Sequence, residues 1–462
     1  MFQMITRGLY PTVLMASIAS AFGVAVYALI HPPQGYEVIF LLPLAYAVVF
    51  CVSVLTVRES PSLLLSGLTA VAYLRYVILT LLLVYNGGYE GRSWQPPSND
   101  SIQYAILLMV YELLAVILAA LFLEGKFRKK HTAIVSSGER PIPLWICFGA
   151  LTFSFALCAL TPPALDLVSF VRPTIVEDET SQPPIAILFA MIFVLSKLFL
   201  CVGLIHRCHL YKGTYKKIMP WLALIIASVN IAIFFGSNRL AILLNAIVSV
   251  VFLFRYFGWR AFMPAAGVLA IFIAVFSIVT EERQYYDSGA PWNMDAADSI
   301  QAYTGGTYNV AIGVEVSEMF PEAGKLEVLL YDLVRPTIGL NIISKNWNIV
   351  YSNIYFNYRM FVHIDRRSQI MPMIAQSNLF FGPLLSPILS ILFIFVGYYL
   401  LSKSHFSKQP ELSFCMLLIV SRITFIFGQN TMNMMNFISL YLILPVILLY
   451  PLANMSRDRR IT

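Results

Sequence analysis

The chain has 462 residues, of which 59% are hydrophobic and only 12% are charged, and its mean hydropathy is +0.75. So few charges cannot cover the surface of a soluble protein of this length, and the composition predicts a protein whose main solvent is lipid. The net charge of +7 is typical of the basic cytoplasmic loops of membrane proteins, and it does not indicate nucleic-acid binding.

Apolar runs of about 20 residues, the length that a helix needs to cross the hydrocarbon, recur along the chain. The first follows Arg7 and continues to Ile30, which favours a retained helix over a cleaved signal peptide. The seventh and eighth meet at a tight hairpin at 236–238. The runs lie at 9–30, 38–57, 62–85, 102–124, 142–161, 185–205, 218–236, 239–256, 261–280, 379–401, 412–428 and 437–455. The sequence therefore predicts an all-α polytopic membrane protein with about 12 transmembrane helices.

Lysines and arginines are concentrated in every second loop, which indicates the orientation because basic loops stay in the cytoplasm. The basic residues on one side are Arg7, Arg58, Lys126, Arg128, Lys129, Lys130, Arg140, Arg207, Lys212, Lys216, Lys217, Arg255, Arg260, Lys403, Lys408, Arg457, Arg459 and Arg460. The short loops on the other side hold only Arg92, Arg172 and Arg239. We therefore expect both termini in the cytoplasm and the long segment 281–376 on the outside.

The long segment between the ninth and tenth runs divides the chain into three parts. These are 1–280 with helices one to nine, 281–376 as a large external loop, and 377–462 with helices ten to twelve, all within one integrated membrane domain. Stretches at 299–320 and 326–343 mix apolar and polar residues at helical spacing, which predicts helices at the interface or packed over the membrane domain. None of the six cysteines lies in this loop, so we expect no disulfide there.

Four ionisable residues fall inside predicted spans, where a charge costs about 2.5–3.5 kcal/mol at the bilayer centre. They are Arg75, Glu112, Lys197 and Arg422. One interpretation is a structural ion pair that uses Glu112, the only carboxylate at that depth. The other is a basic wall for an anionic headgroup, which the surplus of cations favours, with Arg422 at the deep end of an outward cavity leading to Gln429 and Asn430.

Arginines gather on the predicted outer side, and arginine binds phosphate in bidentate fashion at all relevant pH values. They are Arg239 at the hairpin, and Arg283, Arg335, Arg359, Arg366 and Arg367 in the loop. Each alone is typical of a solvated side chain, but the set predicts that two or three converge on a phosphate site. His363 and Asp365 are candidate general bases, as are Glu281 and Glu282. No Ser-His-Asp pattern, Walker loop, HExxH or acidic metal motif is present, so we expect neither a metal nor a cofactor.

Two stretches and one residue spacing resemble a known family. The hairpin FFGSNRLAILLNAIVSV is similar to the Gly-Thr-Arg stretch of the enterobacterial common antigen polymerase, and QIMPMIAQSNLFFGPLLSPILSILFIFVG looks like the entry of these polymerases into a late span. Fifteen residues separate Arg366 from Gly382, a spacing found in external loops of some members, whereas Arg239 and Arg283 have no glycine sixteen positions later. With its late external loop, the chain resembles the bacterial O-antigen-type polysaccharide polymerases of the Wzy family.

The resemblance implies a metal-independent glycosyltransferase of the bacterial inner membrane that uses no cofactor. It would transfer a growing glycan from undecaprenyl pyrophosphate to the terminal sugar of a new lipid-linked repeat unit, on the outer face of that membrane. Its partners would be the repeat units, the bilayer, and a chain-length regulator and a flippase, with no nucleic acid.

The same resemblance, with the chemistry of the residues, assigns the candidate site. His363 or Asp365 would be the base, and Arg239 and Arg335 would stabilise the departing pyrophosphate. Further substrate-binding residues would be Arg283, Arg359, Arg366, Arg367, Arg75, Lys197 and Arg422. Aromatic residues would stack on sugars or anchor the loop at the interface: Tyr285, Tyr286, Trp292, Tyr303, Trp347, Tyr351 and Tyr355.

Two other functions stay open. A ligase that moves lipid-linked glycan to another acceptor would share the same topology. A transporter or flippase of an anionic substrate fits twelve spans with intramembrane cations, but the longest loop lies outside and no matching halves are evident.

Overall fold

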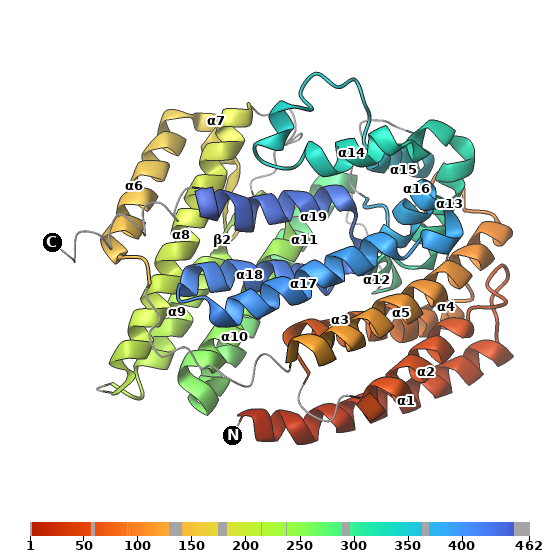
Figure 1. Ribbon diagram of the computed structural model, residues 1–462, viewed down its shortest axis with the longest axis horizontal. Coiled ribbons are helices and arrows are strands. Elements are labelled where there is room, and N and C mark those ends of the chain that lie inside the picture. The colour runs from red at the N-terminus through yellow and green to blue at the C-terminus, as the bar shows by residue number, and fades with distance from the viewer. Residues whose placement is uncertain are drawn as a thin grey trace. The chain divides into compact units, whose positions relative to one another are not determined.

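The computed structural model describes residues 2–56, 61–89, 91, 93–128, 141–173, 183–213, 215–236, 238–288, 296–362 and 369–447. Regular structure in these ranges is almost entirely helical, with one pair of short strands, so the predicted all-α class is confirmed (Figure 1). The chain divides into two compact units. The first unit contains 1–133, 294–402 and 422–439, and the second unit contains 134–293, 403–421 and 440–462. The single integrated membrane domain stays a prediction.

The first unit combines the N-terminal helices with those of the predicted external loop. Its helices are α1 (Phe2–Ile30), α2 (Leu41–Thr56), α3 (Leu63–Tyr73), α4 (Leu79–Tyr85), α5 (Asn99–Arg128), α12 (Ala296–Thr304), α13 (Thr307–Met319), α14 (Leu326–Val334), α15 (Ser352–Phe361), α16 (Met373–Leu385), α17 (Ile388–Phe406, as far as residue 402) and α19 (Thr431–Ile438). A π-helical turn at Leu74–Ile78 joins α3 to α4. Ser62 caps α3 by accepting a hydrogen bond from Leu65 N.

Helix α13 forms part of the interior of the first unit. Its residues from Thr307 to Val316 are all buried, and the helix packs against α5, α15 and α16. Gly313 permits the close approach of α16, because a Cβ atom there would lie 2.5 Å from the Cβ of Ala375. The sequence predicts an interfacial or covering helix here. In the structure this helix is buried within the first unit, and the carboxylate among the buried residues, Glu315, is paired with an arginine.

The second unit holds the central part of the chain. Its elements are α6 (Leu144–Leu160), α7 (Pro162–Asp166), β1 (Val168–Phe170), α8 (Pro184–Leu210), α9 (Met219–Ala232), β2 (Ile233–Phe235), α10 (Arg239–Phe257), α11 (Phe262–Ser288) and most of α18 (Pro410–Ile423). Strands β1 and β2 pair antiparallel, with Ser169 opposite Phe234. Because β2 follows directly, α9 ends at Ala232 and not at the predicted residue 236. A 3-10 turn at Gly258–Ala261 joins α10 to α11, which pack against each other.

Several helices indicate a membrane-embedded protein. Five segments among the described residues are long and apolar enough to span a bilayer: Tyr10–Ile30, Leu63–Tyr85, Asn99–Phe127, Pro184–Leu210 and Arg239–Glu282. The last of these contains both α10 and α11. Other apolar helices have only 10–17 residues, at Leu41–Val54, Leu144–Leu160, Met219–Ala232 and Thr431–Ile447. Twelve spans, cytoplasmic termini and an external loop therefore stay predictions.

The segment 379–401, expected as one span, is broken. Helices α16 and α17 are bent by 107° relative to each other, and together they are long and apolar enough to form a sixth spanning segment. Gly382, in the last turn of α16 and four residues before the break at 386–387, has a φ of 71° and a ψ of 179°, a conformation that is easily adopted only by glycine. Pro383 follows it and cannot continue the hydrogen bonding of the preceding helix. The local sequence Gly-Pro therefore ends the regular part of α16 shortly before the break.

Candidate functional site

Arg335, one of the predicted cations, lies beside a cluster of aromatic rings in the first unit. Tyr331 precedes it by four residues on α14, so both side chains lie on one helix face. The Tyr331 ring centroid is 4.7 Å from that of Tyr351 and 6.2 Å from that of Trp347. Arg335 and Trp347 are partly exposed, so the cluster is open to a ligand. Burial raises the pKa of the Tyr351 hydroxyl, and the positive charge of Arg335 offsets part of this effect.

The guanidinium of Arg335 has little competition from the protein. Its Nη1 donates to the carbonyl oxygen of Asn341 at 3.4 Å, which is long, and the guanidinium also lowers the pKa of the Tyr351 hydroxyl through a side-chain hydrogen bond. The described residues give it no ion pair with a carboxylate. An arginine in this state keeps most of its donors available for an anion.

A buried polar network lies behind this face of α14. Asp332 is fully buried and accepts hydrogen bonds from Ser352 N at 3.2 Å and Gln376 Nε2 at 2.8 Å, as well as from Ser352 Oγ. Gln376 also donates to Thr431 Oγ1 at 2.9 Å and accepts from Thr431 N at 2.9 Å. Burial raises the pKa of the Asp332 carboxyl to about 6, although the hydrogen bonds from Ser352 and Gln376 oppose this rise.

A second network, of side-chain amides, adjoins the first along the sequence. Asn353 Nδ2 and Asn357 Nδ2 both donate to the carbonyl of Gln369, at 3.0 and 2.9 Å. Asn353 Oδ1 accepts from Met371 N at 2.8 Å and from Asn430 Nδ2 at 3.1 Å. Together the two networks connect α14, α15, α16 and the start of α19. They hold the aromatic cluster on a rigid base, because every buried polar group named here has a partner.

Arg359, predicted to bind substrate, is instead engaged by a carboxylate. Its Nε donates to Glu315 Oε2 at 2.9 Å, and its Nη1 donates to the Gln95 carbonyl at 3.2 Å. Glu315 Oε1 also accepts from Ser98 N at 2.7 Å. The guanidinium thereby joins α15 to α13 and to the loop after α4. These contacts support a structural role for Arg359.

The predicted ion pair inside the membrane segments is present. Arg75 Nη1 donates to Glu112 Oε2 at 2.7 Å, and both side chains are fully buried. Arg75 Nε donates to the Gly305 carbonyl at 2.9 Å, and Ser390 Oγ donates to Glu112 Oε1 at 3.0 Å. The guanidinium also lies 5.0 Å from the centre of the Phe427 ring. These contacts support the structural interpretation of Arg75.

The other two cations of the predicted spans also contact protein groups. Lys197, in the second unit, donates from Nζ to the carbonyls of Asn230 and Ile233, both at 2.8 Å. These carbonyls lie at the C-terminal end of α9, where the helix dipole makes a positive charge favourable. Arg422, in the first unit, donates to Gln429 Oε1 at 2.6 Å and lies over the Phe437 ring. The surplus of positive charge therefore does not by itself require an anionic ligand.

The described structure does not test whether the remaining candidates converge. Arg239, at the start of α10 in the second unit, donates to Thr280 Oγ1 at 3.4 Å. Arg283 follows on α11, and its side chain lies outside the described residues, as do His363, Asp365, Arg366 and Arg367. Convergence of these residues with Arg335 stays a prediction. No group of three or more metal-ligating side chains occurs in the parts of the chain that the structure describes.

Tyr331, Asp332 and Gln376 are missing from the sequence prediction. A carboxylate within the apolar run LEVLLYDLV, three residues before Arg335, was an available signal for Asp332. Its partners Ser352 and Gln376 lie 20 and 44 residues away, so the network itself was not visible. No protein-family profile, curated protein sequence or solved structure matches the chain.

Proposed function

We propose that the chain is a glycosyltransferase that polymerises lipid-pyrophosphate-linked oligosaccharide repeat units, as the O-antigen-type polymerases of the Wzy family do. The observation that carries the proposal is the partly exposed Arg335 beside Tyr331, Trp347 and Tyr351. Aromatic rings offer the apolar faces that sugars stack on, and an arginine with available donors suits a pyrophosphate oxygen. This combination fits a ligand that carries both groups.

The donor already carries a pyrophosphate leaving group, so the proposed reaction uses no nucleotide and no metal, and the protein must supply a positive charge to stabilise that group as it leaves. The acceptor hydroxyl oxygen forms a bond to the anomeric carbon of the donor glycan. The bond from that carbon to the pyrophosphate oxygen breaks, and the undecaprenyl pyrophosphate leaves with the electron pair. In this scheme Arg335 stabilises the negative charge that develops on the leaving group. The hydroxyl proton passes to a base, for which His363 or Asp365 remains the sequence prediction.

The place of the reaction follows from the charge distribution along the sequence. Basic residues are few in the predicted outer loops, and Arg335 belongs to the segment predicted to lie outside. The proposed localisation is the inner membrane of a bacterium, with both termini in the cytoplasm and the repeat units joined on the outer face.

Deletion of the gene tests the proposal. The surface polysaccharide of the deletion strain should carry a single repeat unit in place of a ladder, and the chain supplied from a plasmid should restore the ladder. An unchanged ladder contradicts the proposal. Loss of the single-unit band as well would favour a ligase or a flippase.

A transporter of an anionic lipid-linked substrate is the second candidate, because one observation favours it. The 107° break between α16 and α17 is typical of the discontinuous helices that transporters place at their binding sites. Transport by the purified chain in sealed vesicles, without formation of longer glycans from the lipid-linked repeat unit, would decide for this candidate.

A further inference from the structure

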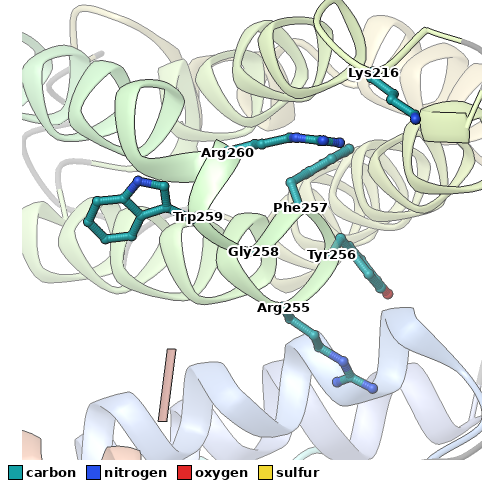
Figure 2. Close-up of a pocket in the computed structure, with 7 residues that line it drawn as sticks. All are labelled: Lys216, Arg255, Tyr256, Phe257, Gly258, Trp259 and Arg260. Carbon is teal, nitrogen blue, oxygen red and sulfur yellow. The ribbon is translucent and has the colours of Figure 1, made fainter. Parts of the chain in front are cut away.

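A cavity of about 430 Å³ opens at the turn between α10 and α11 in the second unit (Figure 2). It is lined by Lys216, Arg255, Tyr256, Phe257, Gly258, Trp259 and Arg260. Six of these residues are consecutive, so the cavity is built by the turn itself with one residue from the segment before α9. Its volume suits a small ligand or the headgroup of a larger one.

Two of the three lining cations are available to a ligand. Figure 2 shows the Arg260 and Lys216 side chains extending into the same space beside Phe257, while Arg255 points away on the other side of the turn. Arg255 Nη1 donates to Ser413 Oγ at 3.2 Å. Both Lys216 and Arg260 are exposed, and the described residues give neither of them a hydrogen bond or an ion pair. Two positively charged side chains that line the same cavity, Lys216 and Arg260, favour an anionic ligand there.

The turn that builds the cavity connects two apolar helices, which is where we expect the chain to leave the hydrocarbon and reach the headgroup region. Helices α10 and α11 belong to the membrane-length apolar segment Arg239–Glu282, and the turn connects their ends. Trp259 is 56% exposed and stacks on Phe262, with 5.2 Å between ring centroids. An exposed tryptophan at the end of an apolar helix is typical of the headgroup region. The same face is the cytoplasmic one in the orientation predicted from the basic loops.

We propose that this cavity binds a phosphate group, with Arg260 and Lys216 as its two cationic ligands. Arginine and lysine together are suited to a phosphate ester, since the guanidinium makes directed hydrogen bonds and the ammonium adds a compact charge. Basic pockets between membrane helices bind anionic lipid headgroups in this way. The phosphate belongs either to an anionic phospholipid or to a soluble phosphate ester. This site is independent of the proposed glycosyl transfer.

The test uses the full-length chain, purified in detergent and freed of bound lipid. The thermal unfolding midpoint is measured against increasing phosphatidylglycerol, phosphatidylcholine or glycerol phosphate. We expect a saturable rise with phosphatidylglycerol that phosphatidylcholine does not match. A rise with phosphatidylglycerol alone assigns a lipid headgroup, and an equal saturable rise with glycerol phosphate assigns a soluble ester. No saturable response to either overturns the proposal.

Matched double variants separate the cavity from general surface charge. Lys216→Gln with Arg260→Gln should weaken the apparent affinity at least about tenfold, since each cation near the membrane surface contributes appreciably to anion binding. Arg207→Gln with Lys217→Gln removes the same charge from exposed residues that do not line the cavity, and it should leave the affinity unchanged. Equal loss in both double variants contradicts the assignment. Lys216→Gln alone provides the comparison if the first double variant does not fold.

Discussion

The side-chain amide of Gln376 lies 2.8 Å from the carboxylate of Asp332, and both residues are fully buried. The same nitrogen lies 2.9 Å from Ser352 Oγ and from Thr431 Oγ1. One side chain at the start of α16 therefore connects α14, α15 and α19. Arg335 and Tyr331 extend from α14, and Tyr351 precedes α15, so this amide supports the helices that carry the proposed site.

Replacement of Arg335 tests its assignment as the cation of the site. Arg335→Ala should abolish the polysaccharide ladder, because the leaving pyrophosphate loses its stabilising charge, while the protein remains at its normal level in the membrane. Lys345→Ala is the control, since it removes an exposed cation from the same connecting segment. Gel analysis of surface polysaccharide and immunoblotting of membranes give the two measurements. A normal ladder with Arg335→Ala would show that the phosphate site is elsewhere.

Asp332 should make stability depend on pH in a defined window. Burial raises its pKa in the folded state from the ordinary 3.8 to about 6, so the folded chain holds this proton between these values and the unfolded chain does not. Its contribution to the free energy of unfolding is fully present below about pH 4 and is lost as the pH rises to about 6, by on the order of 3 kcal/mol.

Asp332→Asn removes the titrating group and should remove this part of the pH dependence. The unfolding midpoints of the two proteins, measured in detergent from pH 4.5 to 7.5, provide the comparison. The stability of the original protein relative to the variant should fall as the pH rises to about 6 and stay nearly constant well above it. Parallel curves over the whole range would contradict the raised pKa.

Removing one partner of the buried pair Arg75–Glu112 should lower the stability of the protein, whereas replacing both partners with apolar residues should lower it much less. Arg75→Leu leaves the Glu112 carboxylate unpaired in the interior and should cost about 3–5 kcal/mol. The double variant Arg75→Met with Glu112→Leu should recover most of this loss, because it leaves no buried charge. Unfolding in detergent measures both. If the double variant folds but gives no ladder, Arg75 contacts substrate and the structural interpretation fails.

The bend between α16 and α17 should depend on Gly382, the non-helical residue in the last turn of α16. Gly382→Ala places a side chain at a φ of 71°, and strain of about 1–3 kcal/mol should lower the unfolding midpoint, although no atom lies within 4 Å of the added Cβ. Gly125→Ala in α5 is the control, since that site is equally open, and this exchange in a helix should be stabilising by up to about 1 kcal/mol. Equal midpoints for the two variants would mean that the bend imposes no strain.

Particular residues show which contacts could be predicted from the sequence and which could not. An ion pair that uses Glu112 was predictable, because a charge in hydrocarbon needs a partner and only one carboxylate was available, but only the structure shows that the partner is Arg75. Arg335 and Trp347 were among the candidates because residue types suited to phosphate and sugar are recognisable in a sequence. Arg359 was predicted to bind substrate on the same grounds. Its contact with Glu315, 44 residues away, depends on how α13 and α15 pack.

The sequence by itself determined the helical membrane class of this chain. Exposing charges or unpaired backbone groups to lipid is costly, so a membrane protein needs long apolar helices. Composition and the lengths of apolar runs show this directly in the sequence. Tertiary structure decided which polar side chains are occupied and which are available. Lys197 contacts the carbonyls where α9 ends, Asp332 is enclosed by α15 and α16, and Arg335 keeps part of its donors free of carboxylates. Whether a polar side chain has a protein partner depends on hydrogen bonds between residues that are distant in sequence. Local sequence patterns do not show these hydrogen bonds.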